Sequence, residues 1–271
     1  MWRDKQIKFL TESECSELGI INILEEYNLK IKDVKEKQIL NQIINDFREN
    51  NFSLLTSQEM NYLLRNSKEK WAPYIIHRYK FHYYENNTEM PDFPLYLILE
   101  PVSSCNLRCP FCMQSDEKFT SNKDMMGMMD LELFKKIIDE AYELGTKAIT
   151  LTGRGEPTLN PHIEEMLEYC SGKFIEIKMN TNATVLNERM CHKILKSGLT
   201  DLVFSVDSYY KEEFESLRVN ANFEKVVSNV KKFKEIKEEF YPNSSCVTRA
   251  SGVQVSDKQN LEKFEEFWKE M

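Results

Sequence analysis

Apolar residues recur three and four positions apart on a charged background in the first third of the chain. The segments IINILEEYNLKI, ILNQIINDF and QEMNYLLRN show this spacing most clearly, and before Pro73 the sole glycine or proline is Gly19. Such spacing is typical of amphipathic helices that bury one face. A turn-forming stretch at 86–88, followed by Pro94, marks the end of this pattern. The pattern predicts a helical N-terminal region over residues 1–92.

Beyond Pro94, short apolar runs alternate with longer stretches of helical spacing. The runs are rich in apolar and β-branched residues, as strands are, and they begin at Leu95, Ala148, Phe174, Asp201 and Val247. The helical stretches between and after them are 131–144, 163–169, 188–195, 223–240 and 259–271. Because each crossover contains a helix, the strands are expected to be parallel. The sequence predicts an α/β fold over residues 93–271, a partial (βα) barrel of parallel strands preceded by the helical region.

Charge and composition restrict the classes of function. Acidic residues number 44 and basic residues 36, so the net charge is −8 and the chain lacks the positive field that favours nucleic-acid binding. No stretch approaches the roughly 18 apolar residues of a membrane span, and the start of the chain carries charges throughout. Seven cysteines without an export signal favour reduced thiols, metal ligands or redox chemistry over disulfides. We expect a cytoplasmic protein without nucleic-acid or membrane partners.

Three of the cysteines follow the first predicted strand with the spacing C-x3-C-x2-C: Cys105, Cys109 and Cys112. Three thiolates in so short a loop can wrap one soft metal centre, and iron–sulfur clusters are held by cysteines at short spacings. A cluster with three protein ligands leaves one iron open to a ligand from outside the protein. Two other interpretations stay open: three small buried residues, and a zinc site completed by His162 or His192.

Glycine, carboxylate and amide residues follow the other strands. GRGEP comes after the second predicted strand, NTN after the third, and SVD at the end of the fourth. Ligands of parallel α/β folds bind at the carboxyl ends of the strands, so these residues are expected near the cysteine loop. Glycines let a ligand approach the backbone, and a carboxylate is the natural partner of an ammonium group. A phosphate-binding loop is the competing interpretation of G-x-G, but the Lys-Ser/Thr that would complete it is missing.

The four motifs, in this order and on successive strands, resemble the radical S-adenosylmethionine (radical SAM) superfamily over about residues 95–255. The resemblance implies a [4Fe-4S] cluster on the three cysteines, with S-adenosylmethionine (SAM) on the fourth iron. It also implies reductive cleavage of SAM to a 5′-deoxyadenosyl radical that abstracts hydrogen from a substrate. The implied partners are a reductant protein, such as a flavodoxin or ferredoxin, and an unidentified substrate: a peptide, a protein or a carbohydrate-related molecule.

The resemblance further implies contacts to SAM by residues after the second and later strands. Gly153, Gly155 and Glu156 match the strip that receives the SAM amino group, although Arg154 stands between the glycines. Contacts to the ribose or the carboxylate of SAM are implied for side chains on the later strands: Asn180, Thr181, Ser205, Asp207 and Arg249. Ser205 and Asp207 lie two positions apart and are therefore expected on the same face of a strand. For Arg249 an anionic group of the substrate is an alternative partner.

The superfamily's common core has six βα units, whereas this chain offers five. The last helical stretch, NLEKFEEFWKEM, has neither a closing glycine nor a following strand, so we expect a truncated chain. Relatives with this cysteine spacing often continue into a SPASM-type domain with auxiliary clusters, which would lie beyond residue 271. The alternative functions are a cluster- or SAM-binding protein without turnover and a zinc-stabilised interaction protein.

Overall fold

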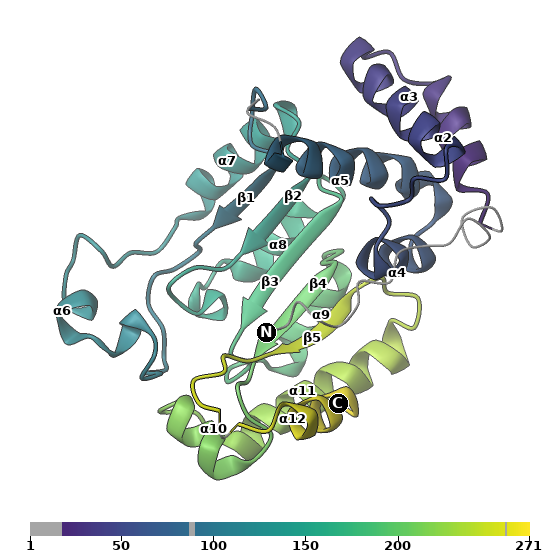
Figure 1. Ribbon diagram of the computed structural model, residues 1–271. Helices are drawn as coiled ribbons and strands as arrows, with labels where there is room; N and C mark the ends of the chain where they lie inside the picture. Colours follow the sequence, from purple (N-terminus) through teal and green to yellow (C-terminus); the bar gives the residue numbers. More distant parts are fainter. Residues whose placement is uncertain (1–17, 87–89, 258) are drawn as a thin grey trace. The chain divides into compact units, whose positions relative to one another are not determined.

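The structure, a computed structural model, describes residues 18–86, 90–257 and 259–271. Its contacts divide the chain into two compact units, Met1–Leu95 and Tyr96–Met271. The described part of the first unit is helical, and the second contains a sheet with helices (Figure 1). Among the described residues no helix is both long enough and apolar enough to cross a membrane.

Four α-helices form most of the described N-terminal unit: α2 (Ile20–Asn28), α3 (Val34–Arg48), α4 (Ser57–Arg65) and α5 (Trp71–Asn86), with the 3-10 turn η1 (Lys68–Lys70) before α5. Polar side chains begin two of them. Asp33 accepts a hydrogen bond from the Glu36 backbone N–H at 2.7 Å, and Thr56 and Glu59 form a capping box. The apolar faces of α2, α3 and α5 pack together, as the periodicity of the sequence predicts.

A buried ion pair joins α4 to α5. The Glu59 carboxylate, 1% exposed, accepts a hydrogen bond from Arg78 Nε at 2.8 Å and another from the Thr56 hydroxyl. The rings of Tyr62 and Tyr74 stack between the same two helices with their centroids 3.6 Å apart. Since an unpaired carboxylate would stay desolvated here, the arginine is required wherever the glutamate is present.

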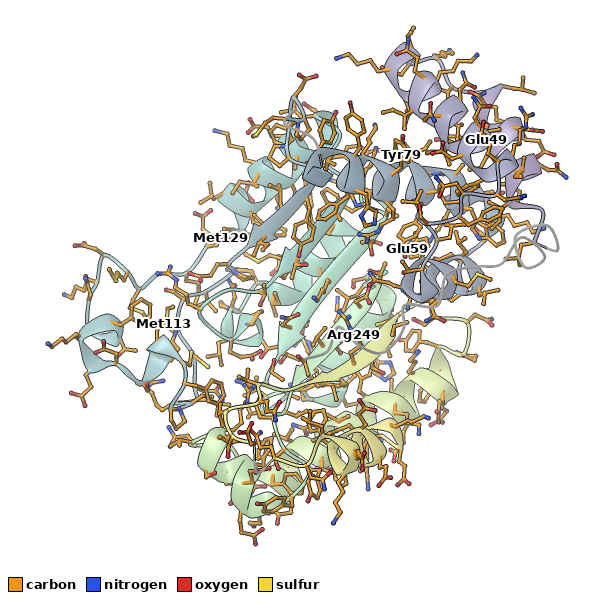
Figure 2. The ribbon with its side chains drawn as sticks, in the orientation of Figure 1. Glu49, Glu59, Tyr79, Met113, Met129 and Arg249 are labelled. Atoms are coloured by element: carbon orange, nitrogen blue, oxygen red, sulfur yellow. The ribbon has the colours of Figure 1, made fainter. Side chains whose placement is uncertain are left out.

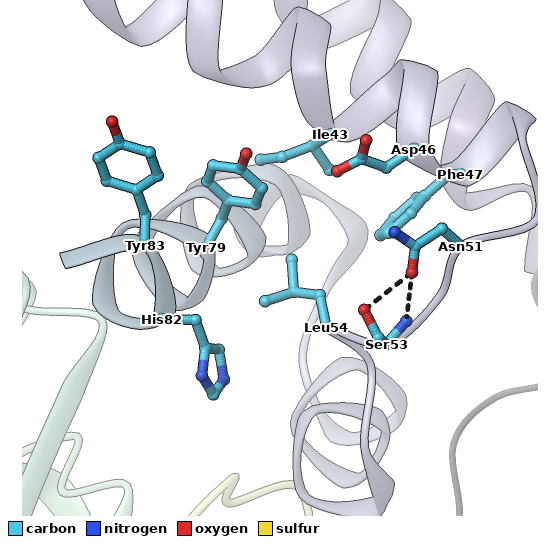
Figure 3. Close-up of a pocket in the computed structure, with 9 residues that line it drawn as sticks. All are labelled: Ile43, Asp46, Phe47, Asn51, Ser53, Leu54, Tyr79, His82 and Tyr83. Atoms are coloured by element: carbon cyan, nitrogen blue, oxygen red, sulfur yellow. Dashed lines mark hydrogen bonds between the residues drawn. The ribbon is translucent and has the colours of Figure 1, made fainter. Parts of the chain in front are cut away.

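A cavity of about 350 Å³ lies within this unit (Figure 3). Its wall comes from α3, the α3–α4 connection and α5, and consists of Ile43, Asp46, Phe47, Asn51, Ser53, Leu54, Tyr79, His82 and Tyr83. Burial raises the pKa of Tyr79, and the Asp46 carboxylate adds to the shift. None of the motifs singled out in the sequence contributes to this wall.

The second unit is built on a sheet of five strands: β1 (Tyr96–Leu99), β2 (Ala148–Leu151), β3 (Glu176–Thr181), β4 (Asp201–Ser205) and β5 (Val247–Ser251). The strands are all parallel and lie in sequence order. The long connecting helices are α7 (Leu131–Glu143), α8 (Ile163–Cys170), α9 (Glu188–Lys196) and α11 (Phe223–Phe240), and α12 (Leu261–Lys269) follows β5. This arrangement is the predicted partial barrel.

The register gives the sheet two different faces. One face carries Leu99, Leu151, Met179 and Leu202, which are all buried and lie at one level of the register. The other face carries Ile98, Thr150, Lys178, Asp201 and Val247 at one level of the register. Ile98 is 62% exposed, so we call this side the open face. A covered face and an open face are typical of a barrel that has not closed.

Short elements that the periodicity did not reveal lie beyond the strand ends. They are η2 (Met113–Ser115), α6 (Glu117–Thr120), η3 (Pro157–Leu159) and α10 (Lys211–Leu217). An element of three to seven residues makes at most two helical turns, which is too short for a repeat to be visible. These elements shape the loops in which the sequence motifs lie.

Candidate cofactor site

The cysteine loop curls back on itself directly after β1. The backbone N–H of Leu107 donates to Cys105 Sγ at 3.4 Å, and that of Cys112 donates to the Cys109 carbonyl at 2.9 Å. Arg108 Nη1 donates to the carbonyl oxygens of Cys105 and Leu107, at 2.7 and 2.8 Å. With Leu107 buried, these contacts hold the three thiols along the wall of one pocket.

The pocket has a volume of about 240 Å³ and lies at the carboxyl ends of β1 to β4. It is lined by Cys105, Leu107, Cys109, Phe111, Cys112, Gln114, Thr152, Gly153, Arg154, Gly155, Glu156, Asn180, Thr181, Asn182, Ser205 and Arg218. All three cysteines and six of the eight residues predicted to contact SAM are in this set. Four separate sequence motifs therefore meet at a single site.

The glycine strip after β2 lies flat against the chain that leads into the cysteine loop. A Cβ atom on Gly155 would come closer than 3.0 Å to the carbonyl oxygens of Val102 and Ser104. The next residue, Glu156, donates its backbone N–H to the Ser104 carbonyl at 2.9 Å. Only glycine permits so close an approach of two backbones, so Gly155 joins the β2 loop to the cysteine loop.

Glu156 joins the ends of β2 and β3. Its carboxylate is 2% exposed. Oε1 accepts from the backbone N–H and the hydroxyl of Thr158 and from the Thr181 hydroxyl, at 3.2, 2.6 and 2.7 Å. Oε2 accepts from the Asn182 backbone N–H at 2.7 Å. Most of the lone pairs of the Glu156 carboxylate thus accept hydrogen bonds from the protein itself. One lone pair of Oε2 is left for a ligand.

The amides after β3 face the pocket and the cysteine loop. Asn180 Oδ1 is buried and has no hydrogen-bond partner among the described residues. Asn182 Nδ2 donates to Asn106 Oδ1 at 2.9 Å and lies 3.9 Å from Cys105 Sγ. The chain then turns at Ala183, where φ is 58°. The sequence prediction included Asn180 and omitted Asn182, although both belong to the NTN motif after the third predicted strand.

Burial raises the pKa of two of the thiols. For Cys105 burial outweighs the hydrogen bond from the Leu107 N–H, and for Cys109 it outweighs the positive charge of Arg218. A bound metal centre reverses this preference, since thiolates are the form that ligates. The donor set of three reduced sulfurs in a pocket lined by glycine and amides suits an iron–sulfur cluster with one iron left for another ligand.

The profile of the radical SAM superfamily matches residues 99–266. The chain belongs to the radical SAM superfamily. Members of this superfamily use a [4Fe-4S] cluster and SAM, so the predicted family and its cofactors are confirmed at this level.

Two curated relatives cover parts of this radical SAM chain. It is 34% identical over 113 residues to the tungsten-containing aldehyde ferredoxin oxidoreductase cofactor-modifying protein of Pyrococcus furiosus, covering 41% of this chain and 30% of that protein. It is 29% identical over 161 residues to the GTP 3′,8-cyclase of Desulforamulus reducens, covering 58% of this chain and 47% of the cyclase. The chain thus spans less than half the length of either relative.

A solved structure has a similar fold. SuiB of Streptococcus suis matches with a TM-score of 0.54 at 21% identity, over 88% of this chain and 53% of SuiB. Such a likeness concerns the fold, and it agrees with the predicted α/β partial barrel.

The zinc interpretation finds no support in the geometry. His162 Nδ1 lies 3.1 Å from Glu165 Oε1, His192 Nδ1 lies 2.9 Å from the Tyr241 hydroxyl, and neither histidine lines the cysteine pocket. Within the part of the chain that the structure describes, no three His, Cys, Asp or Glu side chains converge on a single ion. A cluster needs no such convergence, because each thiolate binds a different iron.

Asp207 lies behind the pocket, whereas the strand alternation had placed it beside Ser205. β4 ends at Ser205, and Asp207 adopts a left-handed φ of 52°, so the alternation stops before it. Its buried carboxylate accepts from Arg218 Nε and from the Val253 N–H, the latter at 2.8 Å. Asp207 therefore holds Arg218, which does line the pocket.

Arg218 is a site residue that the sequence prediction missed. Arg218 directly follows α10 and belongs to no recognisable motif. Its position at the site becomes visible only through its ion pair with the buried Asp207 carboxylate. Its guanidinium also lies over the Phe111 ring, 5.9 Å from the centroid. A fixed arginine in this pocket is suited to a carboxylate.

The side chain of Arg154 forms an ion pair with Glu100. Its Nη2 and Nε donate to the Glu100 carboxylate at 2.6 and 3.0 Å, and its backbone N–H donates at 2.7 Å. The guanidinium lies 5.6 Å from the centroid of the Phe119 ring on α6. Burial raises the pKa of Glu100, but the hydrogen bonds and charge of Arg154 outweigh it and hold that pKa below its ordinary value. Arg154 thus connects the strip to the 113–128 segment.

Proposed function

We propose that this chain binds a [4Fe-4S] cluster through Cys105, Cys109 and Cys112 and binds SAM in the adjoining pocket. In this proposal it acts as a radical SAM enzyme. When bound, the reduced cluster supplies the electron that cleaves SAM to methionine and a 5′-deoxyadenosyl radical, which takes a hydrogen atom from the substrate. The observation that carries the proposal is the meeting of the cysteine loop, the glycine strip and the ends of β3 and β4 around one pocket.

The pocket offers complementary groups for the methionine part of SAM. The strip from Gly153 to Glu156 is assigned to the amino group, since it lines the pocket and Glu156 Oε2 has a free lone pair. Arg218 is assigned to the carboxylate, because a guanidinium held by buried Asp207 is already oriented. Asn180 and Ser205 are assigned to the ribose side of the ligand.

Two polar groups act on the cysteines themselves. The Leu107 N–H donates to Cys105 Sγ, and Asn182 Nδ2 lies within reach of the same sulfur. Donors to a ligating sulfur stabilise the thiolate and raise the reduction potential of a cluster. Arg218 favours the thiolate of Cys109 by its charge. The chain therefore places positive and hydrogen-donating groups where negative charge gathers.

The remaining parts of the proposal concern location and partners. Radical SAM enzymes act on a substrate and need a reductant, and we assign the reductant role to a flavodoxin or a ferredoxin. The substrate class stays a peptide, a protein or a carbohydrate-related molecule. The acidic net charge supports the absence of a nucleic-acid partner. The absence of a membrane partner and a place in the cytoplasm belong to the same proposal.

Electron paramagnetic resonance of the anaerobically reconstituted, dithionite-reduced chain tests the proposal. We expect a [4Fe-4S]⁺ signal whose shape changes when SAM is added, together with formation of 5′-deoxyadenosine. A signal indifferent to SAM would select a cluster protein without turnover. A chain that binds one zinc and no iron would select the zinc-stabilised interaction protein.

Cys109→Ser is the matching variant, with Cys246→Ser as its control. Cys109 faces the pocket, whereas the Cys246 thiol is buried elsewhere and lies 3.9 Å from the Val247 carbonyl, an acceptor that a serine hydroxyl also suits. Loss of iron is expected in the first variant and full iron content in the second. Equal iron in both would contradict the assignment of the ligands.

A further inference from the structure

We propose that Lys178 and Arg249 form a binding site for an anionic group of the substrate on the open face of the sheet, beside the cofactor pocket. The chemical class is a phosphate, pyrophosphate or carboxylate group. As a substrate site this inference rests on the proposed function, and it adds the charge class of the molecule that the enzyme would act on.

The register of the sheet places both cations on one face. Lys178 on β3 is level with Asp201 on β4, and Arg249 on β5 is level with Val203. Lys178 and Asn180 lie two positions apart on β3, so all of these residues share the open face. Figure 2 shows Arg249 at the carboxyl-terminal part of the second unit, where β5 crosses beside β4. The two side chains are long enough to converge in front of Val203 from the strands on either side.

Neither cation has an anionic partner in the described part of the chain. Among the described residues, the side chains of Lys178 and Arg249 make no hydrogen bond and have no carboxylate within 4.0 Å. The two arginines nearest the cofactor differ in this respect, since Arg218 is paired with Asp207 and Arg154 with Glu100. The cations that shape the cofactor pocket are therefore already neutralised, and the pair on the open face is not.

Two carboxylates act on Lys178 without forming an ion pair with it. Glu176 and Asp201 act on Lys178 from a distance beyond an ion pair, and the Asp201 carboxylate also accepts the Thr200 hydroxyl at 2.9 Å. Burial lowers the pKa of Lys178, and the positive charge of Arg249 lowers it further. Half-buried Lys178 and exposed Arg249 repel each other, and a shared anion would remove this repulsion and supply hydrogen-bond acceptors.

The position of the site relates it to the chemistry. On the open face Asn180 lies level with Val203 and Arg249, and both Asn180 and Ser205 also line the cofactor pocket. A substrate whose anion lies on Lys178 and Arg249 would extend along the strands toward Asn180 and so reach the place where SAM is assigned. Two cations on the strands that flank β4 would orient such a substrate and decide which hydrogen faces the cofactor.

The test is a calorimetric titration of the full chain with sodium pyrophosphate and, separately, with sodium malonate. The chain carries its cluster and saturating SAM, so that the carboxylate of SAM occupies Arg218. We expect Lys178→Gln and Arg249→Gln each to weaken pyrophosphate binding about tenfold or more, as the loss of a charged hydrogen bond does. The double variant is expected to show no binding. Malonate binding of similar strength would identify a carboxylate site, and pyrophosphate binding alone would identify a phosphate site.

Lys196→Gln and Arg189→Gln are the matched controls, since both side chains are exposed on α9 and away from the open face. Both controls should bind pyrophosphate like the parent chain. The inference is overturned if the parent chain binds neither anion, or if all four single variants bind alike. Because the titration needs no turnover, it separates from the proposed function. The chain could bind the anion through both cations while its paramagnetic resonance signal does not change with SAM. That result would support the anion site and contradict the proposed enzyme function.

Discussion

The two units each contain a buried carboxylate paired with an arginine, and the pairs do different work. Glu59 and Arg78 join two helices of the N-terminal unit, and the Glu59 carboxylate also takes the hydroxyl of its own capping box. Asp207 and Arg218 hold a loop in the second unit, where the arginine faces a pocket. The chemistry and the burial are nearly the same. What differs is whether the arginine has a side left for a ligand.

This comparison teaches how to interpret a buried ion pair. Burial alone indicates the cost of breaking the pair, because either partner left alone stays desolvated. It says nothing about function. Function is indicated by the surroundings of the arginine: tyrosines and helix backbone around one pair, and thiols, glycines and an unpartnered amide around the other.

The largest effect is expected from Arg78→Met, which leaves Glu59 buried and unpaired. We expect the free energy of unfolding to fall by about 3–5 kcal/mol, with SAM affinity unchanged in the protein that remains folded. Chemical denaturation followed by circular dichroism measures the first quantity and equilibrium dialysis with labelled SAM the second. A loss of SAM affinity would end the functional distinction between the two pairs.

Arg218→Met is expected to lower stability too, because it leaves the buried Asp207 carboxylate unpaired, but unlike Arg78→Met it should also weaken SAM binding. Losing a charged hydrogen bond to the SAM carboxylate should weaken SAM binding by about 10- to 100-fold. Asp207→Asn sharpens the test, because Asn keeps an acceptor for the Val253 N–H and removes the charge that holds Arg218. Its SAM affinity should fall between those of the parent chain and Arg218→Met. Unchanged affinity in both variants would make the second pair structural like the first.

A smaller effect is expected from Arg154→Gly, which restores the usual glycine of the family strip. The variant loses the ion pair with Glu100, whose two side chains are partly exposed, and the cation–π contact with Phe119. We expect SAM affinity to change by less than about threefold, since exposed ion pairs contribute little. Cleavage by trypsin at Lys118 and Lys123 should become faster, because the 113–128 segment loses the contact between Phe119 and Arg154. A large loss of SAM binding would place Arg154 among the ligand contacts.

The smallest effect concerns pH and the same pair. The pKa of Glu100 lies below its ordinary value, so the carboxylate contributes stability above that ordinary value and loses it as the pH falls through the lowered pKa. As the pH falls from 7 through the lowered pKa, the cluster-free parent chain should therefore lose melting temperature through this group, whereas a carboxylate with an unshifted pKa contributes no such loss. Glu100→Gln should lower the melting temperature at pH 7 by about 1–2 °C and leave it unchanged at a pH below the lowered pKa. An equal difference at both pH values would contradict the pairing.

Much of the fold could be predicted from the chain because its signals are local. Helical periodicity foretold α3 and α7, and short apolar runs foretold where all five strands begin to within two residues. The open face was harder to foresee. Ile98 belongs to an apolar run, and only the register shows that it points to the exposed side of the sheet.

The candidate site divides in the same way. Cys105, Cys109 and Cys112 share one loop, so their spacing alone predicts that they meet. Gly155 follows β2 and Ser205 is the last residue of β4, and the rule that ligands gather at strand ends places both correctly. Asp207 lies just beyond β4, and the alternation rule fails there because the strand ends at Ser205 and the next turn is left-handed.

The sequence by itself determined the family, the cysteine loop and the layout of strands and helices, because each depends on residues close together in the chain. Only the tertiary structure decided that the Glu156 carboxylate accepts hydrogen bonds from the end of β3. It likewise decided that Arg218 lines the pocket while paired with Asp207. It also decided that Lys178 and Arg249 stand together without a partner among the described residues. These features depend on contacts between segments that are far apart in the sequence. Burial makes such contacts strong, but they produce no sequence periodicity from which they could be predicted.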